Sequence, residues 1–237
     1  MARRSWPDIL YEDNELLVIN KPAGLLSVAT EAQRTATAWR QVTDYLQIRN
    51  KRARAHVVHR LDRDTSGVLL FAKNERLKLA LQERWNDLVS CRGYQAVVAG
   101  CPSREEDTIR TWLLENRAHV VYSAPKSKGG KEAVTRYRVV ESRKGFTLLE
   151  VEIDTGRKNQ IRVHMAEMGC PVVGDRKYGD GSDPLHRLGL HAGKLALTHP
   201  VTGKELAFTA PMPREFRRFF SDKTSKEAAP HENEKET

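Results

Sequence analysis

The sequence has few cysteines and no long apolar run, and each shortage argues against a class of protein. Its 237 residues include three cysteines, Cys91, Cys101 and Cys170, and no pair of them has C-x-x-C spacing. This pattern argues against a disulfide framework and against a zinc cluster, and it predicts free thiols in a reducing compartment. No apolar run approaches the roughly 20 residues of a membrane span, and the N-terminus lacks the apolar core of a signal peptide. We therefore expect a cytoplasmic protein without a metal site and without membrane association.

Acidic residues are also in short supply. Lys and Arg number 40 against 31 Asp and Glu, which gives a formal net charge of +9. Residues 221–237 hold three lysines and five acids, a net of −2, so residues 1–220 carry +11. Such an excess suits a polyanionic partner, because cations that neutralise phosphates release counterions. Charge alone does not separate a nucleic-acid-binding protein from an ordinary basic one.

Short apolar segments between turns make up most of the chain. They predict strands within 9–21 and 56–73 and at 94–99, 107–115, 118–123, 133–141, 146–154, 188–197 and 205–209. Helices are predicted over 35–49, from an N-cap at Asn74 through Leu88, over 158–168 with Gly169 as the C-cap glycine, and over 214–220. Many strands with few helices indicate an α+β fold, with a mixed, largely antiparallel sheet and helices on its faces. We predict one domain over 1–220 and a disordered charged tail over 221–237.

The segment from His59 to Gly67, HRLDRDTSG, crowds two arginines and two aspartates into a turn between apolar runs. A carboxylate beside guanidinium groups, such as Asp62, stays ionised because a nearby positive charge favours the anion. An oriented carboxylate can act as a nucleophile or stabilise an oxocarbenium-like centre. A turn held together by Asp–Arg ion pairs explains the same residues equally well.

These nine residues resemble the signature of the RluA-type family of RNA pseudouridine synthases. Segments 20–24 (NKPAG), 93–96 (GYQA) and 155–164 (TGRKNQIRVH) resemble further family motifs in the same order. With shorter matches at 190–192 and 208–211, the resemblance covers about residues 8–220. It implies the pseudouridine synthase fold with a central active-site cleft and no metal or organic cofactor. Some relatives carry a separate N-terminal RNA-binding domain, which we do not expect here, because only about eight residues precede the first matching segment.

The resemblance also implies roles for single residues. Asp62 matches the aspartate that attacks or stabilises the ribosyl carbon of the target uridine, and Arg162 matches the basic residue that ion-pairs with it. Tyr94 matches a tyrosine that packs against the flipped base and can take a proton from the sugar. Ile161 matches an apolar residue of the uracil pocket, and Arg60 matches the arginine that fills the gap left by the flipped base. The expected catalytic residues are therefore Asp62, Tyr94 and Arg162.

Further cations are candidates for binding RNA. Lys21 and Arg157 lie within the matching motifs, and we expect both to contact the substrate. Lys126, Lys128 and Lys131 belong to a basic loop that either grips phosphate or is a solvated mobile loop.

Several other residues are expected to be ordinary. Asn159 stands where many family members have His, and we expect a tolerated variant. Asp64 is predicted to be a turn residue. His59 and His164 are predicted to be structural, and the indoles of Trp39 and Trp85 are expected in the core.

The sequence thus predicts a monomeric RNA pseudouridine synthase that acts on ribosomal or transfer RNA by base flipping with an aspartate nucleophile. An RNA-binding or chaperone module that lost the reaction is a second hypothesis, but intact Asp62, Tyr94 and Arg162 argue against it. A glycosidase or nucleoside hydrolase is a third. It would need two carboxylates about 5–10 Å apart, and Asp64 is the only candidate near Asp62.

Overall fold

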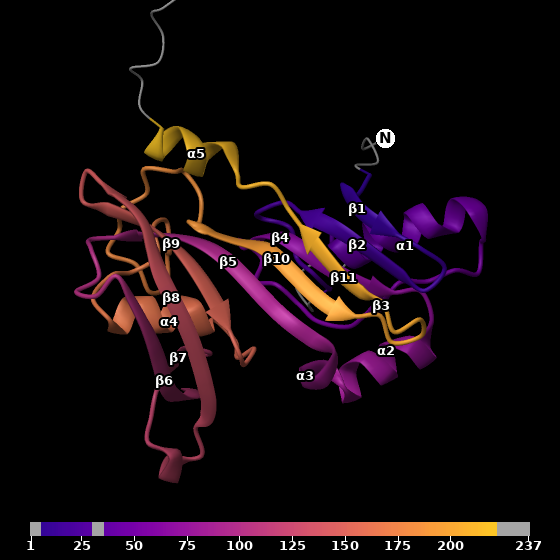
Figure 1. Cartoon of the computed structure of the whole chain (residues 1–237), viewed down its shortest axis with the longest axis horizontal. Coiled ribbons are helices and arrows are strands. Elements are labelled where there is room, and N and C mark those ends of the chain that lie inside the picture. The colour runs from indigo at the N-terminus through magenta and orange to yellow at the C-terminus, as the bar shows by residue number, and fades with distance from the viewer. Residues whose placement is uncertain (1–5, 30–35, 222–237) are drawn as a thin grey trace, which may run out of the picture.

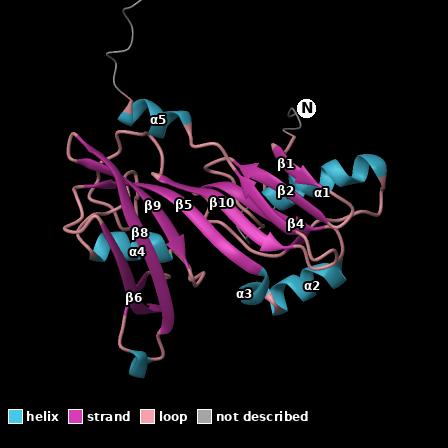
Figure 2. Ribbon diagram, viewed as in Figure 1, coloured by secondary structure: helices cyan, strands magenta, loops and turns pink. Residues whose placement is uncertain are grey.

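A mixed sheet of eleven strands forms the framework of the computed structural model, which describes residues 6–29 and 36–221 (Figures 1 and 2). The main path of the sheet follows the order β1 (Ile9–Glu12), β2 (Leu16–Lys21), β4 (Ser66–Ala72), β10 (Leu190–Thr198), β5 (Val89–Ala99), β9 (Phe146–Ile153), β8 (Lys131–Arg143), β6 (Glu106–Glu115) and β7 (Val121–Ser123). Two short strands lie off this path: β3 (His56–Val57) pairs with β4, and β11 (Glu205–Thr209) pairs with β10. The predicted disordered tail, from residue 222 on, lies outside the described residues.

Strands β4 and β10 pair in parallel, whereas the other pairs among the described strands are antiparallel. At this junction Gly67 has φ +114°, and a Cβ there would lie 2.1 Å from the carbonyl oxygen of Ala192. Only glycine allows both the positive φ and this close approach of two backbones. The glycine that ends the HRLDRDTSG segment is therefore needed where the two strands meet.

Helices cover both faces of β2 and β4. Helix α1 (Ala38–Arg49) contributes Val42 to a cluster with Leu17, Ile19 and Phe71. Helix α2 (Glu75–Glu83) contributes Leu81 to the cluster on the other face. The strand residues of this second cluster alternate along β2 and β4 with those of the first. Successive side chains of a strand point to opposite faces, so strands covered on both sides read as continuous apolar runs.

The other half of the sheet is covered in the same way. Helix α4 (Gln160–Glu167) packs Ile161 and Met165 against one face of β5 and β9. Helix α5 (Arg214–Phe220) packs Phe216 and Phe220 against the opposite face. The long strand β5 joins the two halves, since it pairs with β10 on one side and β9 on the other.

The predicted α+β class and the largely antiparallel sheet are confirmed, and so is the N-cap at Asn74, whose side chain accepts a hydrogen bond from the backbone N–H of Leu77. The prediction of one helix from Asn74 through Leu88 is wrong. Helix α2 ends at Glu83, Arg84 has φ −104° and ψ 23°, and a new turn of helix, α3 (Trp85–Leu88), begins there. The strand expected over 118–123 is also shorter, because residues before Val121 form a turn with His119 at φ 59°.

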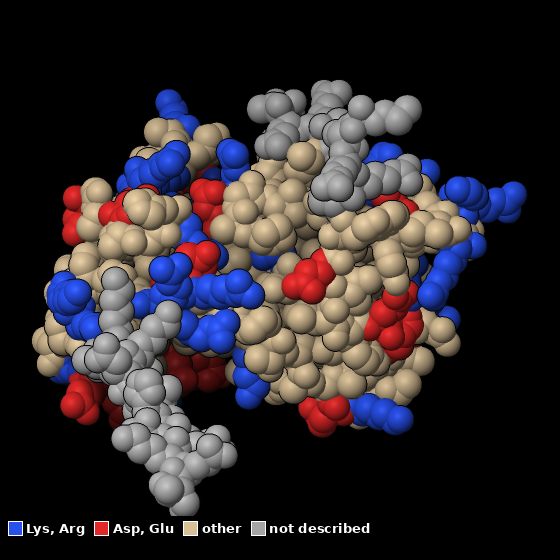
Figure 3. Space-filling model, turned by 90° about the horizontal axis from the view of Figure 1, so that it is seen from above, with Lys and Arg blue, Asp and Glu red and all other residues tan. Residues whose placement is uncertain are grey.

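The basic excess is spread over the surface. On the face shown in Figure 3, Lys and Arg gather beside the end of the described chain and along the opposite edge, with Asp and Glu scattered among them. Among the described residues, no helix has both the length and the apolar character needed to cross a membrane.

Candidate active site

The loop that carries Asp62 runs between β3 and β4 and is fixed on both sides of that residue. The hydroxyl of Ser27 donates to the carbonyl oxygen of Leu61 at 2.7 Å and accepts from the N–H of Leu61 at 3.0 Å. On the other side, the ammonium of Lys21 donates to the carbonyl oxygen of Arg63 at 2.9 Å. The side chain of Asp62 is 29% exposed, so a rigid loop presents a carboxylate that is accessible without being fully solvated.

The predicted contact of Lys21 with RNA disagrees with its position. Lys21 is completely buried, and its ammonium also donates to the carbonyl oxygens of Pro22 and Leu25. Burial lowers the pKa of Lys21 to about 8, against the opposing pull of Asp64 and Asp62. All three protons of the ammonium have partners, so Lys21 ties the NKPAG loop to the Asp62 loop instead of reaching the solvent.

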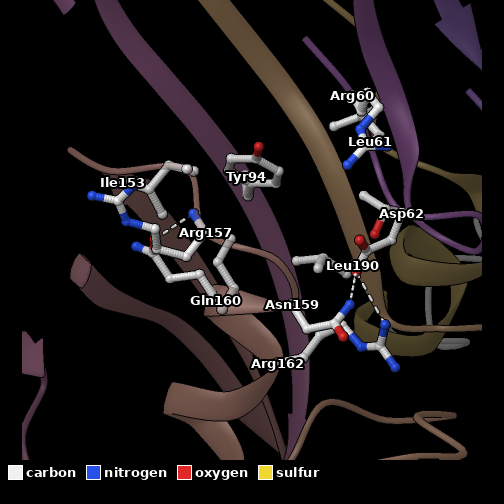
Figure 4. Close-up of a pocket in the computed structure, with 13 residues that line it drawn as sticks. Arg60, Leu61, Asp62, Tyr94, Ile153, Arg157, Asn159, Gln160, Arg162 and Leu190 are labelled. Atoms are coloured by element: carbon white, nitrogen blue, oxygen red, sulfur yellow. Dashed lines mark hydrogen bonds and ion pairs between the residues drawn. The ribbon is translucent and has the colours of Figure 1, made fainter. Parts of the chain in front are cut away.

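The carboxylate of Asp62 is oriented through one of its two oxygens. Its Oδ2 accepts from Arg162 Nη1 at 3.0 Å and from Asn159 Nδ2 at 2.6 Å (Figure 4). Both donors come from the start of α4, about 100 residues away in the sequence. No described residue donates to the other oxygen, Oδ1, which leaves it available to a substrate.

Arg162 is itself held by a second carboxylate that sequence analysis did not single out. Its Nε and Nη2 donate to the two oxygens of Asp175, each at 2.7 Å, and the side chain of Asp175 is fully buried. Asp175 Oδ1 also accepts from the backbone N–H groups of Lys177 and Tyr178. These hydrogen bonds and the guanidinium hold the pKa of Asp175 below its usual range although burial opposes them, and the pair raises the pKa of Arg162. The fork-to-fork geometry fixes the direction in which Arg162 reaches Asp62.

Asn159 is more than a tolerated variant. It lies in the left-handed region at φ 54°, where asparagine is one of the few non-glycine residues found, and its amide reaches Asp62. The hydroxyl of Tyr178 donates to its Oδ1 at 3.3 Å, and the ring of Tyr178 lies 5.3 Å from the guanidinium carbon of Arg162. Tyr178 therefore braces both donors of Asp62, although nothing in the sequence marks it beyond being an aromatic residue in a loop.

Asp62 opens onto a pocket, here called the Asp62 pocket, with an apolar side and a basic rim. Tyr94 from β5, Ile161 from α4 and Leu190 from β10 supply apolar walls. Burial raises the pKa of Tyr94 to about 12, so the phenol is protonated at neutral pH. The full lining is Arg60, Leu61, Asp62, Thr65, Tyr94, Ile153, Gly156, Arg157, Asn159, Gln160, Ile161, Arg162 and Leu190.

The cations predicted to bind RNA fall into two groups. Arg60 and Arg157 are exposed at the rim of the Asp62 pocket, and Figure 4 shows them on opposite sides of Tyr94. Arg157 also donates from Nε to the carbonyl oxygen of Glu132. Lys126, Lys128 and Lys131 lie at a short 3-10 turn (Lys126–Lys128) and at the start of β8, exposed and outside the lining of this pocket.

Asp64 is exposed and absent from the pocket lining, in which Asp62 is the only acid. The two-carboxylate arrangement of a glycosidase is therefore missing among the described residues that line the pocket. No group of three His, Cys, Asp or Glu side chains in the described part of the chain is placed to hold a metal ion.

The two histidines expected to be structural have internal contacts. His164 is 1% exposed and bonded to the hydroxyls of Thr111 and Thr135, and His59 accepts from the N–H of Leu70. Burial lowers the pKa of each histidine to about 4. Both rings are therefore neutral at physiological pH.

Comparison with known proteins points in one direction. A family model described as "RNA pseudouridylate synthase" matches residues 15–167. The chain is 37% identical over 212 residues to the uncharacterized RNA pseudouridine synthase YhcT of Bacillus subtilis, covering 89% of this chain and 70% of that protein. It is 34% identical over 227 residues to the ribosomal large subunit pseudouridine synthase D of Zymomonas mobilis, covering 90% of this chain and 71% of that protein.

Solved structures agree with the sequence comparisons. The chain resembles human RNA pseudouridylate synthase domain containing 4 with a TM-score of 0.73 and 26% identity, covering 88% of this chain and 90% of that one. Human RNA pseudouridylate synthase domain containing 1 gives a TM-score of 0.70, also at 26% identity, over 89% of this chain and 85% of that one.

Proposed function

Because this chain belongs to the RluA-type family of RNA pseudouridine synthases, and so is an isomerase that converts uridine in RNA to pseudouridine, we propose that Asp62 is its nucleophile and ribosomal RNA its substrate. The single observation that carries the first proposal is the asymmetry of the Asp62 carboxylate. One oxygen is anchored by Arg162 and Asn159, the other has no partner among the described residues, and Asp62 lines the pocket. A nucleophile needs both features, since a fixed carboxylate reacts with less loss of entropy.

The proposed reaction keeps all atoms within the substrate, apart from one exchanged proton. Oδ1 of Asp62 attacks or stabilises C1′ of the ribose as the bond from C1′ to N1 of uracil breaks. The uracil rotates and C5 bonds to C1′, which breaks any bond between C1′ and Asp62 Oδ1 and restores the free carboxylate. The hydrogen of C5 leaves as a proton, and N1 takes up a proton. Uracil held between Tyr94 and Ile161 would keep its ring in the pocket during this rotation, and the partly buried, protonated phenol suits a wall better than a base in the free enzyme.

A uridine stacked in RNA must leave the stack to reach Asp62, at a cost of a few kcal/mol. We propose that Arg60 occupies the vacated space. Its side chain is exposed at the rim, near Asp62 in sequence, and no described residue pairs with it. A planar guanidinium can stack on bases and still contact a phosphate.

The choice of ribosomal over transfer RNA rests on the similarity to the ribosomal large subunit enzyme. Unmodified transcripts of large-subunit RNA and a mixture of tRNA transcripts, each labelled with tritium at uridine C5, test it by the amount of tritium released. We expect release to plateau at a whole number of sites per large-subunit RNA and near zero for tRNA. Release from tRNA alone would reject the ribosomal assignment, and release from neither would reject the catalytic one.

The roles proposed for the cations predict different defects. Arg60→Ala should slow conversion at saturating RNA about tenfold or more and weaken binding less, because stacking matters only after the base has flipped. Lys126, Lys128 and Lys131 changed together to Ala should instead lower affinity and flatten its salt dependence. The log–log slope should fall by about 0.7 for each phosphate of a single strand that is no longer neutralised. Single-turnover rates and affinities over a range of salt separate the two. An Arg60→Ala protein with a normal saturating rate and weaker binding would make Arg60 a phosphate clamp.

The monomeric state, the cytoplasmic location and the extent of the catalytic domain over residues 1–220 stay predictions.

A further inference from the structure

The Asp62 pocket continues into a longer groove, here called the Trp85 groove, that ends at α3. Its lining includes Arg157 and Lys158, which precede α4, and Gln82, Trp85 and Asn86 from α2 and α3. Figure 1 shows α3 where β5 begins and α4 apart from it, farther to the left. The lining contains five cationic side chains and one carboxylate, that of Asp62. This charge balance fits a polyanion such as a nucleic-acid strand far better than a basic or neutral partner.

Trp85 packs against the core cluster that contains Leu77, Leu81 and Leu88, as its helical spacing predicts, but it is only partly buried and also lines the groove. The break at Arg84 ends α2, and Trp85 lies half-buried in the groove wall with its ring centroid 5.0 Å from that of His59. Its indole N–H has no hydrogen-bond partner among the described residues. The N–H of Trp39, by contrast, donates to the carbonyl oxygen of Ala55 at 2.7 Å. Trp39 is a satisfied structural residue, whereas Trp85 presents an unpaired donor and an aromatic surface to the groove.

Polar groups flank this surface without closing it. The amide nitrogen of Gln82 donates to the carbonyl oxygens of Val57 and Val58, each at 3.2 Å, which fixes the amide and leaves its oxygen as a free acceptor. Asn86 is exposed, and its amide has no partner among the described residues. A fixed acceptor and a free amide beside an aromatic ring are the groups that recognise the edge and the face of an unstacked base.

We propose that this end of the groove binds one unpaired base of the substrate RNA, a few nucleotides from the target uridine, stacked on Trp85 with its edge against Gln82 and Asn86. The proposal rests on the proposed function, because the groove is continuous with the Asp62 pocket. It adds that the substrate carries a second unstacked nucleotide near the site of reaction. Losing a base–aromatic stack of this kind weakens binding about tenfold or more.

Tryptophan fluorescence tests the site without relying on catalysis. A base stacked on an indole quenches its emission, so single-stranded oligoadenylate of twelve nucleotides should quench the wild-type protein. The quench should disappear in Trp85→Phe and persist in Leu79→Ala, whose side chain is 55% exposed on α2 and outside the groove lining. An equal quench in Trp85→Phe would overturn the proposal. So would quenching by a twelve-residue oligoglutamate in place of the RNA, which would indicate a protein-binding surface.

A base-deletion experiment on the RNA converted in the tritium assay locates the partner nucleotide. Abasic residues placed one at a time around the target uridine should, at one position, weaken binding to wild type about tenfold and leave binding to Trp85→Ala unchanged. Gln82→Ala, which alters an exposed side chain, should show a smaller loss at the same position. Uniform losses at every position in both proteins would reject the subsite. Because the experiment uses an RNA that the wild-type protein has been shown to convert, uniform losses would reject the subsite alone, whereas the absence of any converted RNA would reject the proposed function.

Discussion

Asp62→Asn is expected to lower pseudouridine formation at least about 1,000-fold, the range seen when an enzyme loses its nucleophile. The substitution preserves the shape of the side chain and removes only the negative charge that attacks or stabilises C1′. The fold should survive, because Arg162 keeps its two bonds to Asp175 and the Asp62 loop keeps its bonds to Ser27 and Lys21. RNA affinity should stay within a few-fold of wild type. Tritium release under single-turnover conditions and filter binding of the same RNA measure the two quantities.

Asp64→Asn is the matched control. It removes the same charge two residues away, but from an exposed side chain outside the pocket lining, so the rate should be close to wild type. Activity of Asp62→Asn above a tenth of wild type would reject the nucleophile assignment. Equal losses in the two variants would show that the charge of the loop matters and the position of the carboxylate does not.

The physical pattern of residues and the resemblance to a family predicted different amounts of this site. The physical pattern around Asp62, a carboxylate between arginines, was equally consistent with a surface turn. The resemblance to a family added Tyr94 and Arg162 to the predicted site. In the structure Arg162 contacts Asp62, and Tyr94 lines the same pocket. Neither periodicity nor composition could have paired residues 100 positions apart.

Asp175 and Tyr178 were missed for a related reason. Both lie in an irregular segment after α4, where no hydrophobic period indicates burial, and Asp175 is buried only because Arg162 meets it there. The opposite error was made for Lys21, which was expected to contact the substrate but is completely buried. A lysine after an apolar strand usually reaches solvent, and only the three carbonyl oxygens that surround its ammonium make its burial possible.

The spacing of apolar residues predicted where most helices lie but not where one of them breaks. Apolar spacing located α1, α4 and α5 to within a few residues, because each packs one face on the sheet. The spacing of Leu77, Leu81, Trp85 and Leu88 equally predicted a continuous helix. The helix instead breaks at Arg84, where the sequence has no proline or glycine that would predict a break.

Arg162→Met is expected to be the most damaging change outside Asp62 itself. It leaves the fully buried carboxylate of Asp175 without a cation, and breaking such a pair costs about 3–5 kcal/mol. It also removes one of the two donors that orient Asp62. We therefore expect a large loss of thermal stability together with a loss of activity of at least about a hundredfold, measured at a temperature where circular dichroism shows the variant to be folded. Wild-type stability would contradict the Arg162–Asp175 pair, and wild-type activity would contradict the anchoring of Asp62.

Asn159→Gly separates the two effects because it removes the other donor and leaves the ion pairs intact. Glycine accepts the φ of 54° without strain, so stability should change little. A hydrogen bond to a charged group contributes about 1.5–3 kcal/mol, which predicts a fall in the single-turnover rate of about tenfold or more. If both donors act by holding Oδ2 of Asp62, the double variant Arg162→Met/Asn159→Gly should lose less activity than the product of the single losses. Once Arg162 is removed, the Asp62 carboxylate is already free to rotate, so the further removal of the Asn159 side chain should lower activity only slightly. Independent, multiplicative losses would mean that the two side chains serve different steps, with Asn159 acting on the substrate and not on Asp62.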